Sequence, residues 1–445
     1  MELDGKRVIV LGLGKSGIAA AKLCRARGAR VIGTDSAPAA KLAPEAGALG
    51  IELVLGGHDG VDFKRANLIV VSPGVPDFPA LKDAELSGIE VIGELELAAR
   101  FIDAPIVAIG GTNGKSTTTT LVGDMFKAGK LETFVGGNLG TPSAEAVGKR
   151  FDLVVLEVSS FQVERVPRFQ PRVSVLLNIS EDHLDRYPSF LAYAEAKGNA
   201  FANQSPDDFA IVPEGDSDCL AQAKRGKGQI LRFGSYGDYV VSGRTVLETR
   251  TGELFDLEQS ALHGRHNLEN AAAAIAAARA LDLAPSAIRR ALAAFVPLPH
   301  RMARVATVGD VNFYDDSKGT NVGAAVTALR GLAEERGVLI AGGRDKHGSY
   351  EPLVAALEAK GRAVIVIGEA SERIAEAVGT RVQLVRAKSM DEAVIQAFAR
   401  AKAGDAVLLS PACSSFDMFE SYADRGDRFV ESVLRLEASQ SEVKP

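Results

Sequence analysis

The sequence predicts an α/β protein of three domains, each built around its own mostly parallel sheet. The chain has 445 residues, which at roughly 150 residues per domain suits three hydrophobic cores. Short apolar runs alternate with helical patterns along the chain, and glycine-rich turns follow several of the apolar runs. Such alternation is typical of βαβ units with buried parallel strands.

The first block opens with the apolar run RVIVLG at residues 7–12 and closes near Gly93. A helical pattern at 16–27 and a second strand at 30–35 complete a β–α–β unit. We therefore expect a Rossmann-like N-terminal domain with a parallel sheet over residues 1–93.

The second block begins with the strand PIVAI at residues 105–109, followed by a glycine-rich turn that carries Gly-Lys-Ser. It ends in an alanine-rich helix expected over 270–280 and a shorter one over 285–295. Two alternate prolines in PLPH, at 297–300, exclude both a continuing helix and a central strand, so this segment is expected to be a linker. We predict a central P-loop ATPase-like α/β domain over residues 94–298.

The third block, residues 299–445, contains four further apolar runs, GVLIAGG, AVIVIGE, VQLVRA and AVLLSPA, with helical patterns between them. This alternation predicts a C-terminal Rossmann-like α/β domain. The last segment, EASQSEVKP at 437–445, is polar and is expected to be a frayed tail.

Composition excludes several classes of protein. Hydrophobic residues make up 46% and charged residues 24%, values near the globular average that exclude a disordered or fibrous chain. There are 51 Lys and Arg against 57 Asp and Glu, a formal charge of −6, so no overall field attracts nucleic acid or an anionic membrane. The three cysteines lie far apart in the sequence and are odd in number, so we expect reduced thiols and no disulfide framework. No signal peptide and no long apolar run is found, and we expect a soluble cytoplasmic protein.

The clearest motif is GGTNGKST at residues 110–117, between the strand PIVAI and a helix expected to begin near Thr118. Successive backbone N–H groups at a helix N-terminus cradle phosphate, Lys115 reaches the β- and γ-phosphates, and the Ser116 hydroxyl can bind Mg²⁺. The strict pattern G-x-x-x-x-G-K-[ST] asks for glycine where this chain has Ile109. A glycine-rich turn that happens to hold a lysine is the alternative, but the strand–loop–helix context favours phosphate binding.

A second glycine cluster, Gly12-x-Gly14-x-x-Gly17, follows the first strand, and Asp35 stands at the end of the second. This is the dinucleotide fingerprint, in which the acid binds a ribose hydroxyl, and it raises the hypothesis of a nicotinamide-dependent oxidoreductase. The same glycines are also needed wherever a strand packs closely on its crossover helix, so the pattern does not decide the ligand. The SPG turn at 72–74 is another strand end at which open α/β sheets bind ligands.

Other polar side chains also stand at strand ends. Glu157 ends the apolar strand at 153–156, where an acid can hold Mg²⁺, although strand-end glutamates are common. His183 lies in the acidic run at 178–185 and suits either a metal or proton role or a structural one. Lys197 falls on an expected helix, where a solvated lysine is the ordinary interpretation.

Three polar segments of the third block follow predicted strands: DDSKGTN at 315–321, GGRDK at 342–346 and SPACSSFD at 410–417. Because the carboxyl ends of parallel strands meet at one edge of a sheet, we expect the three to converge on one crevice. Lysines and hydroxyls gathered there would suit a small dicarboxylate or a phosphate.

In this order, the motifs resemble those of the Mur ligases of bacterial cell-wall synthesis, and most of all the members that add D-glutamate. The resemblance spans essentially the whole chain and rests on GGTNGKST, LEVSSFQ, NISEDHLDRYPS, HGRHNLENAAAA, LPHRM, DDSKGTNVGA, GGRDK and LLSPACSSFDMF. The family's loop has the form GTNGK[ST] and requires no glycine at position 109, which accounts for the departure from the strict P-loop pattern at Ile109.

The resemblance implies an ATP-dependent ligase in peptidoglycan precursor synthesis. ATP would phosphorylate the alanine carboxylate of UDP-N-acetylmuramoyl-L-alanine, and the amine of D-glutamate would attack the resulting acyl phosphate. Every ligand is an anion, so the site must concentrate positive charge from lysines and Mg²⁺. The family also implies two Mg²⁺ ions and a CO₂-derived carbamate on Lys197, which converts a cation into an oxygen ligand. We expect a monomer that binds neither nucleic acid nor the membrane interior.

Site residues carry over by position. The resemblance assigns catalysis to Lys115, Glu157, His183 and Lys197. It assigns ATP to Gly111, Thr112, Asn113, Gly114, Lys115, Ser116, Thr117, Thr118, Asn267, Asn270, Arg301 and Asp316. It assigns the UDP substrate to Gly14, Lys15, Ser16, Asp35, Ser36, Ser72, Gly74, Asn138 and His183. It assigns D-glutamate to Lys318, Thr320, Lys346, Ser415 and Tyr422, the last standing where the family has phenylalanine. It assigns the metals to Ser116, Glu157, His183 and carbamylated Lys197.

Two other classes of function are weaker matches. A nicotinamide-dependent oxidoreductase leaves the loop at Lys115 without a role. A regulatory P-loop switch lacks the Asn-Lys-x-Asp guanine signature, has glutamate at position 157 where an aspartate is expected, and gives the third domain no task.

Overall fold

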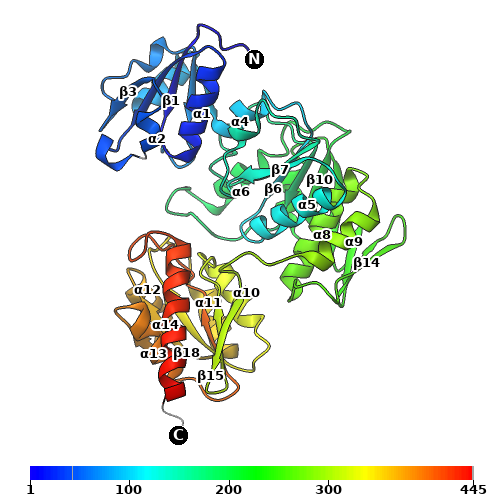
Figure 1. The fold of residues 1–445 in the computed structure, drawn as a ribbon, viewed down its shortest axis with the longest axis vertical. Coiled ribbons are helices and arrows are strands. Elements are labelled where there is room, and N and C mark those ends of the chain that lie inside the picture. The colour runs from blue at the N-terminus through cyan, green and yellow to red at the C-terminus, as the bar shows by residue number, and fades with distance from the viewer. Residues whose placement is uncertain (43, 443–445) are drawn as a thin grey trace. The chain divides into compact units, whose positions relative to one another are not determined.

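The computed structural model describes residues 1–42 and 44–442 and shows an α/β protein with three sheets (Figure 1). The chain forms two compact units. The first comprises Met1–Ile179, Ala194–Ser260 and Asn267–Phe295, and the second comprises Ser180–Tyr193, Ala261–His266 and Val296–Pro445. The first unit holds two of the sheets and the second holds the third.

The N-terminal sheet has the predicted Rossmann-like form. Its strand order is β3-β2-β1-β4-β5, and every neighbouring pair is parallel. The strand order reverses between β1 and β4, and open parallel sheets commonly bind ligands at the carboxyl ends of such a pair of strands. The strands are β1 (Arg7–Leu11), β2 (Arg30–Asp35), β3 (Glu52–Leu55), β4 (Leu68–Val71) and β5 (Glu90–Gly93). The helices are α1 (Lys15–Ala26), η1 (Ala39–Lys41), α2 (Pro44–Gly47), η2 (Phe63–Arg65), α3 (Pro79–Leu86) and α4 (Glu94–Ala99).

The central sheet is larger than the sequence pattern indicated. Its order is β14-β13-β12-β11-β10-β9-β6-β8-β7, parallel from β7 to β12 and antiparallel from β12 to β14. The strands are β6 (Ile106–Gly110), β7 (Thr133–Gly137), β8 (Leu153–Glu157), β9 (Val173–Leu176), β10 (Phe209–Pro213), β11 (Gln229–Gly234), β12 (Tyr239–Ser242), β13 (Thr245–Glu248) and β14 (Glu253–Asp256). The helices of this region are α5 (Lys115–Ala128), η3 (Ser143–Ala146), α6 (Phe190–Gly198), α7 (Ser217–Ala223), α8 (Arg265–Ala280) and α9 (Pro285–Ala294).

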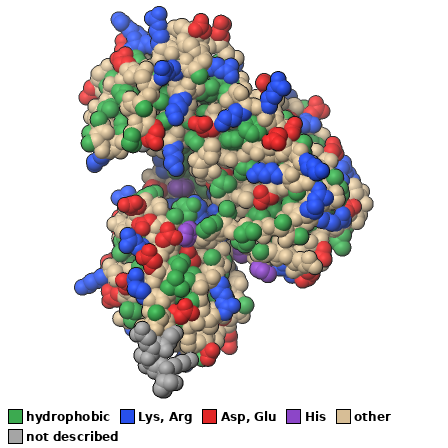
Figure 2. Space-filling model, in the orientation of Figure 1, with side chains coloured by type: hydrophobic (Ala, Val, Ile, Leu, Met, Phe, Trp, Pro, Cys, Tyr) green, Lys and Arg blue, Asp and Glu red, His purple; other side chains and the backbone are tan. Residues whose placement is uncertain are grey.

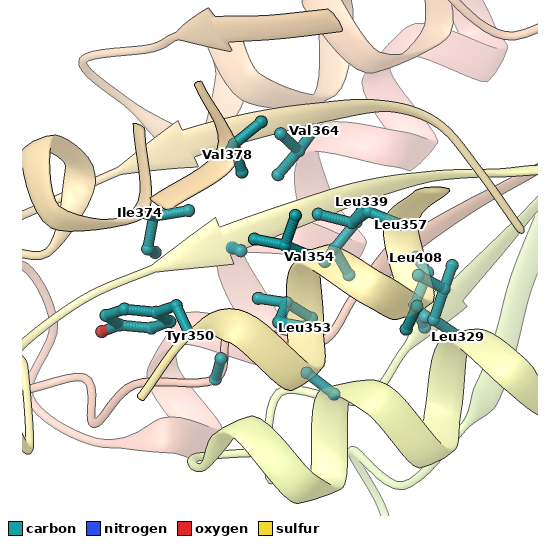
Figure 3. Packing of buried hydrophobic residues seen from close by; sticks show 14 of the residues in the cluster. Leu329, Leu339, Tyr350, Leu353, Val354, Leu357, Val364, Ile374, Val378 and Leu408 are labelled. Atoms are coloured by element: carbon teal, nitrogen blue, oxygen red, sulfur yellow. The ribbon is translucent and has the colours of Figure 1, made fainter. Parts of the chain in front are cut away.

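The third sheet has the order β15-β16-β20-β17-β18-β19 and is parallel except for β15. Figure 3 shows one face of its core, where strand residues such as Leu339 and Val364 pack on Leu353 of α11 and Ile374 of α12. The strands are β15 (Ala303–Val308), β16 (Val311–Asp315), β17 (Gly337–Gly342), β18 (Gly361–Ile367), β19 (Gln383–Arg386) and β20 (Ala406–Leu409). The helices are α10 (Val322–Arg330), α11 (Glu351–Lys360), α12 (Ser371–Val378), α13 (Met390–Phe398) and α14 (Tyr422–Glu442).

Three sequence-based boundaries were wrong. Helix α5 begins at Lys115 and not near Thr118, because left-handed Gly114 ends the loop directly before it. Helix α8 begins at Arg265, five residues before the expected start, and so includes the polar run that was expected to precede it. The expected tail is helical as far as Glu442, because α14 buries an apolar stripe of Phe429, Val433 and Leu436 against the third sheet (Figure 1, red); the rest of that tail lies outside the described residues.

Surface charge is mixed. Figure 2 shows Lys and Arg side chains interspersed with Asp and Glu over the visible face, in agreement with the small net charge. Within the described part of the chain, no helix combines the length and the apolar character needed to cross a bilayer. The three cysteines, Cys24, Cys219 and Cys413, are buried free thiols, as predicted.

Candidate functional site

The glycine loop after β1 is shaped by contact with the loop after β4. The Ser72 hydroxyl donates to the Gly12 carbonyl over 2.7 Å, and Gly12 has a φ of +84°. A Cβ on Gly17 would lie 1.8 Å from that same carbonyl. Close packing therefore accounts for both glycines, and the fingerprint requires no nicotinamide cofactor.

Asp35 at the end of β2 fixes this loop. Its Oδ2 accepts from the Leu13 N–H at 2.7 Å and its Oδ1 from the Ala37 N–H at 2.8 Å. Helix α1 starts after Gly14 and has no acidic residue in its first turn, so its N-terminus favours an anion. The predicted UDP-substrate residues of this domain all lie at the carboxyl ends of β1, β2 and β4, on the last strand residue, the following loop or the first turn of α1: Gly14, Lys15, Ser16, Asp35, Ser36, Ser72 and Gly74.

The phosphate loop joins β6 to α5, as the motif predicted. Gly111 and Gly114 have φ values of +143° and +85°, which side chains other than glycine rarely adopt. Nζ of Lys115 donates to the carbonyls of Gly111 and Thr112 at 2.9 and 2.7 Å. The lysine thus closes the loop on itself and brings a positive charge to it.

Asn178, just after β9, was not among the predicted site residues. Its Oδ1 accepts from the N–H groups of Asn113 and Thr112 at 2.9 and 3.2 Å, and its Nδ2 donates to the Asn113 carbonyl at 3.1 Å. One amide side chain therefore holds the phosphate loop from the adjacent strand. The signal was present in the sequence, because Asn178 opens the polar run after that strand.

Glu157 lies at the end of β8, paired in register with Ile109 of β6. Its side chain is 2% exposed, and its Oε1 accepts from Nδ2 of Asn138 at 2.6 Å. Its Oε2 is buried and has no hydrogen-bond partner. A buried carboxylate oxygen without a partner is costly unless a cation or donor completes it. The residue therefore fits a Mg²⁺ ligand.

Lys197 on α6 is buried, at 6% exposed, so the interpretation of a solvated helix lysine is wrong. Its Nζ donates to the Gly111 carbonyl at 2.8 Å, the same oxygen that Lys115 contacts. Asn270 on α8 packs against Gly114 of the same loop, because a Cβ on Gly114 would come within 2.3 Å of the Asn270 Oδ1. Its Nδ2 donates to Oδ1 of Asn267 at 3.3 Å.

The described residues contain no group of three His, Cys, Asp or Glu side chains placed to bind one metal ion. This suits Mg²⁺, which is commonly held by one or two carboxylates together with substrate phosphates and water.

The second unit brings together the three polar loops of the third sheet. They leave the neighbouring strands β16, β20 and β17. The Ala412 N–H donates to the Gly319 carbonyl at 2.9 Å, and the Arg344 N–H donates to the Ser414 carbonyl at 2.9 Å. The predicted convergence on one edge is confirmed.

Asp316 is enclosed in this edge. The Ser410 hydroxyl donates to its Oδ2 at 2.7 Å. Burial raises the pKa of the Asp316 carboxyl to about 7, although that hydrogen bond and the Arg301 charge oppose the shift. A carboxyl with so high a pKa is poised to change protonation near neutrality.

The loop that carries His183 belongs to the same unit. Asp182, which was not predicted as a site residue, accepts from Nζ of Lys346 at 2.9 Å and from Nδ2 of Asn321 at 3.2 Å. His183 has a φ of +55°, and its N–H donates to Asp182 Oδ1 at 2.9 Å. Nothing in the local pattern distinguishes Asp182 from the other acids around His183.

Tyr422 begins α14 beside the same edge. Nζ of Lys318 lies 3.9 Å from the centre of its ring, a cation–π contact that phenylalanine would also provide. Ser415 is buried at 3% exposed.

The predicted residues thus fall into two groups. The first unit holds Lys115, Ser116, Asn138, Glu157, Lys197, Asn267 and Asn270, with the UDP-substrate residues of the first sheet. The second unit holds His183, Arg301, Asp316, Lys318, Thr320, Lys346, Ser415 and Tyr422.

Three family models match successive parts of the chain, and all three describe Mur ligase domains. Residues 6–93 match the "Mur ligase MurD-like, N-terminal domain", residues 109–278 the "Mur ligase middle domain" and residues 300–413 the "Mur ligase, glutamate ligase domain".

Relatives agree over nearly the full length. A UDP-N-acetylmuramoylalanine–D-glutamate ligase from Geotalea daltonii is 45% identical, covering 98% of this chain and 99% of its own. Another of that name, from Trichlorobacter lovleyi, is 44% identical over 98% of this chain and 100% of its own.

Solved structures show the same fold at low identity. A UDP-N-acetylmuramate-alanine ligase from Thermotoga maritima has a TM-score of 0.61 at 19% identity, covering 98% of this chain and 99% of that one. A pseudomurein peptide ligase type C from Methanothermus fervidus has a TM-score of 0.63 at 18% identity, covering 97% and 100%.

Proposed function

Since the chain belongs to the Mur ligase family, we propose that it joins D-glutamate to the alanine carboxyl of UDP-N-acetylmuramoyl-L-alanine at the expense of ATP. This is an amide-forming step of peptidoglycan precursor synthesis. Relatives that bear this name and are about 45% identical over nearly the whole chain support the proposal. The observation that carries it is local: Glu157, a buried glutamate with one carboxylate oxygen lacking a partner, is paired in register with Ile109, the residue directly before the GGTNGKST loop.

The chemistry needs activation because a carboxylate is a poor electrophile. One oxygen of the alanine carboxylate attacks the γ-phosphorus of ATP, and ADP leaves. The amine of D-glutamate then attacks the acyl carbon, loses a proton, and expels phosphate. Along this path Lys115 stabilises charge on the phosphates, and the backbone N–H groups of the loop hold them.

Mg²⁺ would neutralise phosphate charge and orient the transferred group. Ser116, Glu157, His183 and Lys197 would hold the two ions, with Lys197 acting as a carbamate. The partnerless Oε2 of Glu157 supports the first of these sites. The burial of Lys197 beside the phosphate loop suits a modified, oxygen-bearing side chain. The carbamate can be tested by replacing Lys197 with Ala, which should remove most activity, and added short carboxylic acids should restore part of it. Turnover at the wild-type rate by Lys197→Ala would contradict the carbamate.

Each domain takes one ligand in this proposal. The N-terminal domain, 1–93, takes the uridine nucleotide, the central domain, 94–298, takes ATP and metal, and the third, 299–445, takes D-glutamate. Asn138 and His183 would contact the UDP substrate, and Asn267, Asn270, Arg301 and Asp316 would contact ATP. The enzyme would act as a monomer in the cytoplasm, where ATP is available.

A coupled phosphate-release assay tests the function. Phosphate should appear at a sustained rate only when UDP-N-acetylmuramoyl-L-alanine, D-glutamate, ATP and Mg²⁺ are all present. Omitting the amino acid, or supplying L-glutamate or D-alanine, should reduce the rate to background. ATP turnover that is indifferent to the amino acid would contradict the proposal.

A further inference from the structure

Arg425 lies in the first turn of α14 and is 0% exposed. Its side chain is the largest of those that are fully buried among the described residues. Its three hydrogen bonds all go to uncharged oxygens, and burial lowers the pKa of its guanidinium to about 10. The charges of Asp417, Asp315 and Asp316 offset only part of that shift. A buried cation without a direct carboxylate partner is costly, so its position calls for an explanation.

The bonds of Arg425 join three separate segments of the second unit. Nη2 donates to the Ser317 carbonyl at 2.8 Å and Nε to the Ser317 hydroxyl at 3.0 Å. Nη1 donates to the Cys413 carbonyl at 3.1 Å. The Ser317 hydroxyl in turn donates to the Tyr422 carbonyl at 2.7 Å, which closes the connection to the start of α14.

The loop after β17 packs on the same group. Gly343 has a φ of +133°, and a Cβ there would lie 2.2 Å from the Ser414 carbonyl and 3.2 Å from Nη1 of Arg425. This loop carries Lys346, two positions beyond Arg344, whose N–H donates to Ser414. One guanidinium is therefore bonded to the loops after β16 and β20, and the loop after β17 leaves no room for a side chain at Gly343 beside it.

We infer that Arg425 is a positioning residue that fixes the D-glutamate pocket. The inference rests on the proposed function and adds a residue that does not itself contact the amino acid. The planar guanidinium presents donors in a fixed fork, so its three bonds set the spacing of Lys318, Ser415 and Tyr422.

The test compares Arg425→Lys with Arg428→Lys. Lysine keeps the positive charge at position 425 but removes the fork. Arg428 lies one turn further along α14, is 62% exposed and pairs with Asp424, so it serves as a matched control. In Arg425→Lys the KM for D-glutamate should rise at least about tenfold, since small misplacements of binding groups have effects of that size or more. The KM for ATP should stay within twofold, and Arg428→Lys should match the wild type.

A partial reaction separates positioning from general damage. Acyl phosphate formed without D-glutamate can be trapped with hydroxylamine as a hydroxamate. Its yield from Arg425→Lys should equal that of the wild type, while amide formation falls. Ser317→Ala is a milder variant that removes the bonds to Arg425 Nε and the Tyr422 carbonyl, and it should raise the KM for D-glutamate in the same direction.

Two outcomes would overturn the inference. One is an unchanged KM for D-glutamate in both Arg425→Lys and Ser317→Ala. The other is a parallel loss of hydroxamate formation, thermal stability and amide formation, which would assign Arg425 a purely structural role. Failure of the proposed function is distinguishable, because the wild type itself would then show no dependence on D-glutamate.

Discussion

The phosphate loop of the first unit and the amino-acid loops of the second both lie at the carboxyl ends of parallel strands, but they are constructed differently. The phosphate loop is one contiguous segment between β6 and α5, shaped by glycines with positive φ. The proposed amino-acid site draws on loops after three strands, and a buried residue from α14 is bonded to two of them. A site of the first kind is defined by local sequence, whereas one of the second kind is defined by packing.

The largest expected effect is on the phosphate loop. Replacing Lys115 by Ala removes the charge that this loop brings to the phosphates, so kcat/KM should fall by about 10³-fold, as for a lost electrostatic group in an active site. Lys127→Ala, at an exposed position near the end of the same helix, should have little effect. Phosphate-release kinetics measure both variants; retention of more than a tenth of wild-type activity by Lys115→Ala would contradict the role of Lys115.

Glu157→Gln should have the next largest effect. The amide keeps an oxygen for the bond from Asn138 but removes the negative charge that fits Mg²⁺. Activity should fall by about 10²-fold, and the Mg²⁺ concentration for half-maximal rate should rise. Glu132→Gln, at an exposed position of the first unit, is the control. A lower rate with an unchanged Mg²⁺ dependence would argue against a metal ligand.

Gly114→Ala tests whether backbone shape defines the phosphate loop. The residue has a φ of +85°, and a Cβ would lie 2.3 Å from Oδ1 of Asn270. The free energy of unfolding should drop by about 2–3 kcal/mol, from the left-handed backbone and the overlap together. Gly148→Ala has a φ of +79° but open space around its Cβ, so it should lose only about 1 kcal/mol. Equal losses, measured by urea unfolding, would mean that the contact with Asn270 has no effect.

Asp316 tests the second unit through pH. Burial raises the pKa of this carboxyl from 3.8 to about 7. The folded state therefore binds its proton more tightly than the unfolded state, so its stabilising contribution is complete below pH 3.8 and is lost as the pH rises through 7. Asp316→Asn should reduce the fall in unfolding free energy between pH 4 and 7.5 by about 4 kcal/mol, since each unit of pKa difference corresponds to about 1.4 kcal/mol. Glu94 of the first unit has a pKa raised to about 7 by burial, so only the difference between wild type and variant is informative. Identical pH profiles would contradict the shift.

The smallest effect concerns Tyr422. Its ring contacts the Lys318 ammonium at 3.9 Å, and this contact does not need the hydroxyl. Tyr422→Phe should therefore change the KM for D-glutamate by less than about twofold, whereas Tyr422→Leu should raise it about two- to fivefold through loss of the cation–π contact. A large effect of Tyr422→Phe would show that the hydroxyl takes part in binding.

Contiguous patterns predicted most of the fold and the phosphate loop. Strand and helix periodicity located many of the parallel strands, and GGTNGKST located the glycine loop between β6 and α5, because each signal lies within a few neighbouring residues. The parallel strands β7, β10 and β11 of the central sheet were missed, and so were the short hairpin strands β12 to β14, which lack a strong apolar run.

The missed site residues share a physical reason. Asn178 holds Asn113 across 65 positions of the chain, and Arg425 holds Ser317 across 108. Such contacts depend on which strands become neighbours in the sheet, and no spacing rule in one sequence specifies them. The family resemblance supplied the residues that are proposed to touch ligands, but not those that hold the loops in place.

One isotope measurement tests the central chemistry directly. UDP-N-acetylmuramoyl-L-alanine with a heavy oxygen isotope in its alanine carboxylate is converted with ATP and D-glutamate, and the released phosphate is analysed by mass spectrometry. With both carboxylate oxygens labelled, activation by an acyl phosphate predicts one heavy oxygen in each phosphate that is released together with the amide. Unlabelled phosphate accompanying amide formation would contradict ATP-driven activation of the carboxylate.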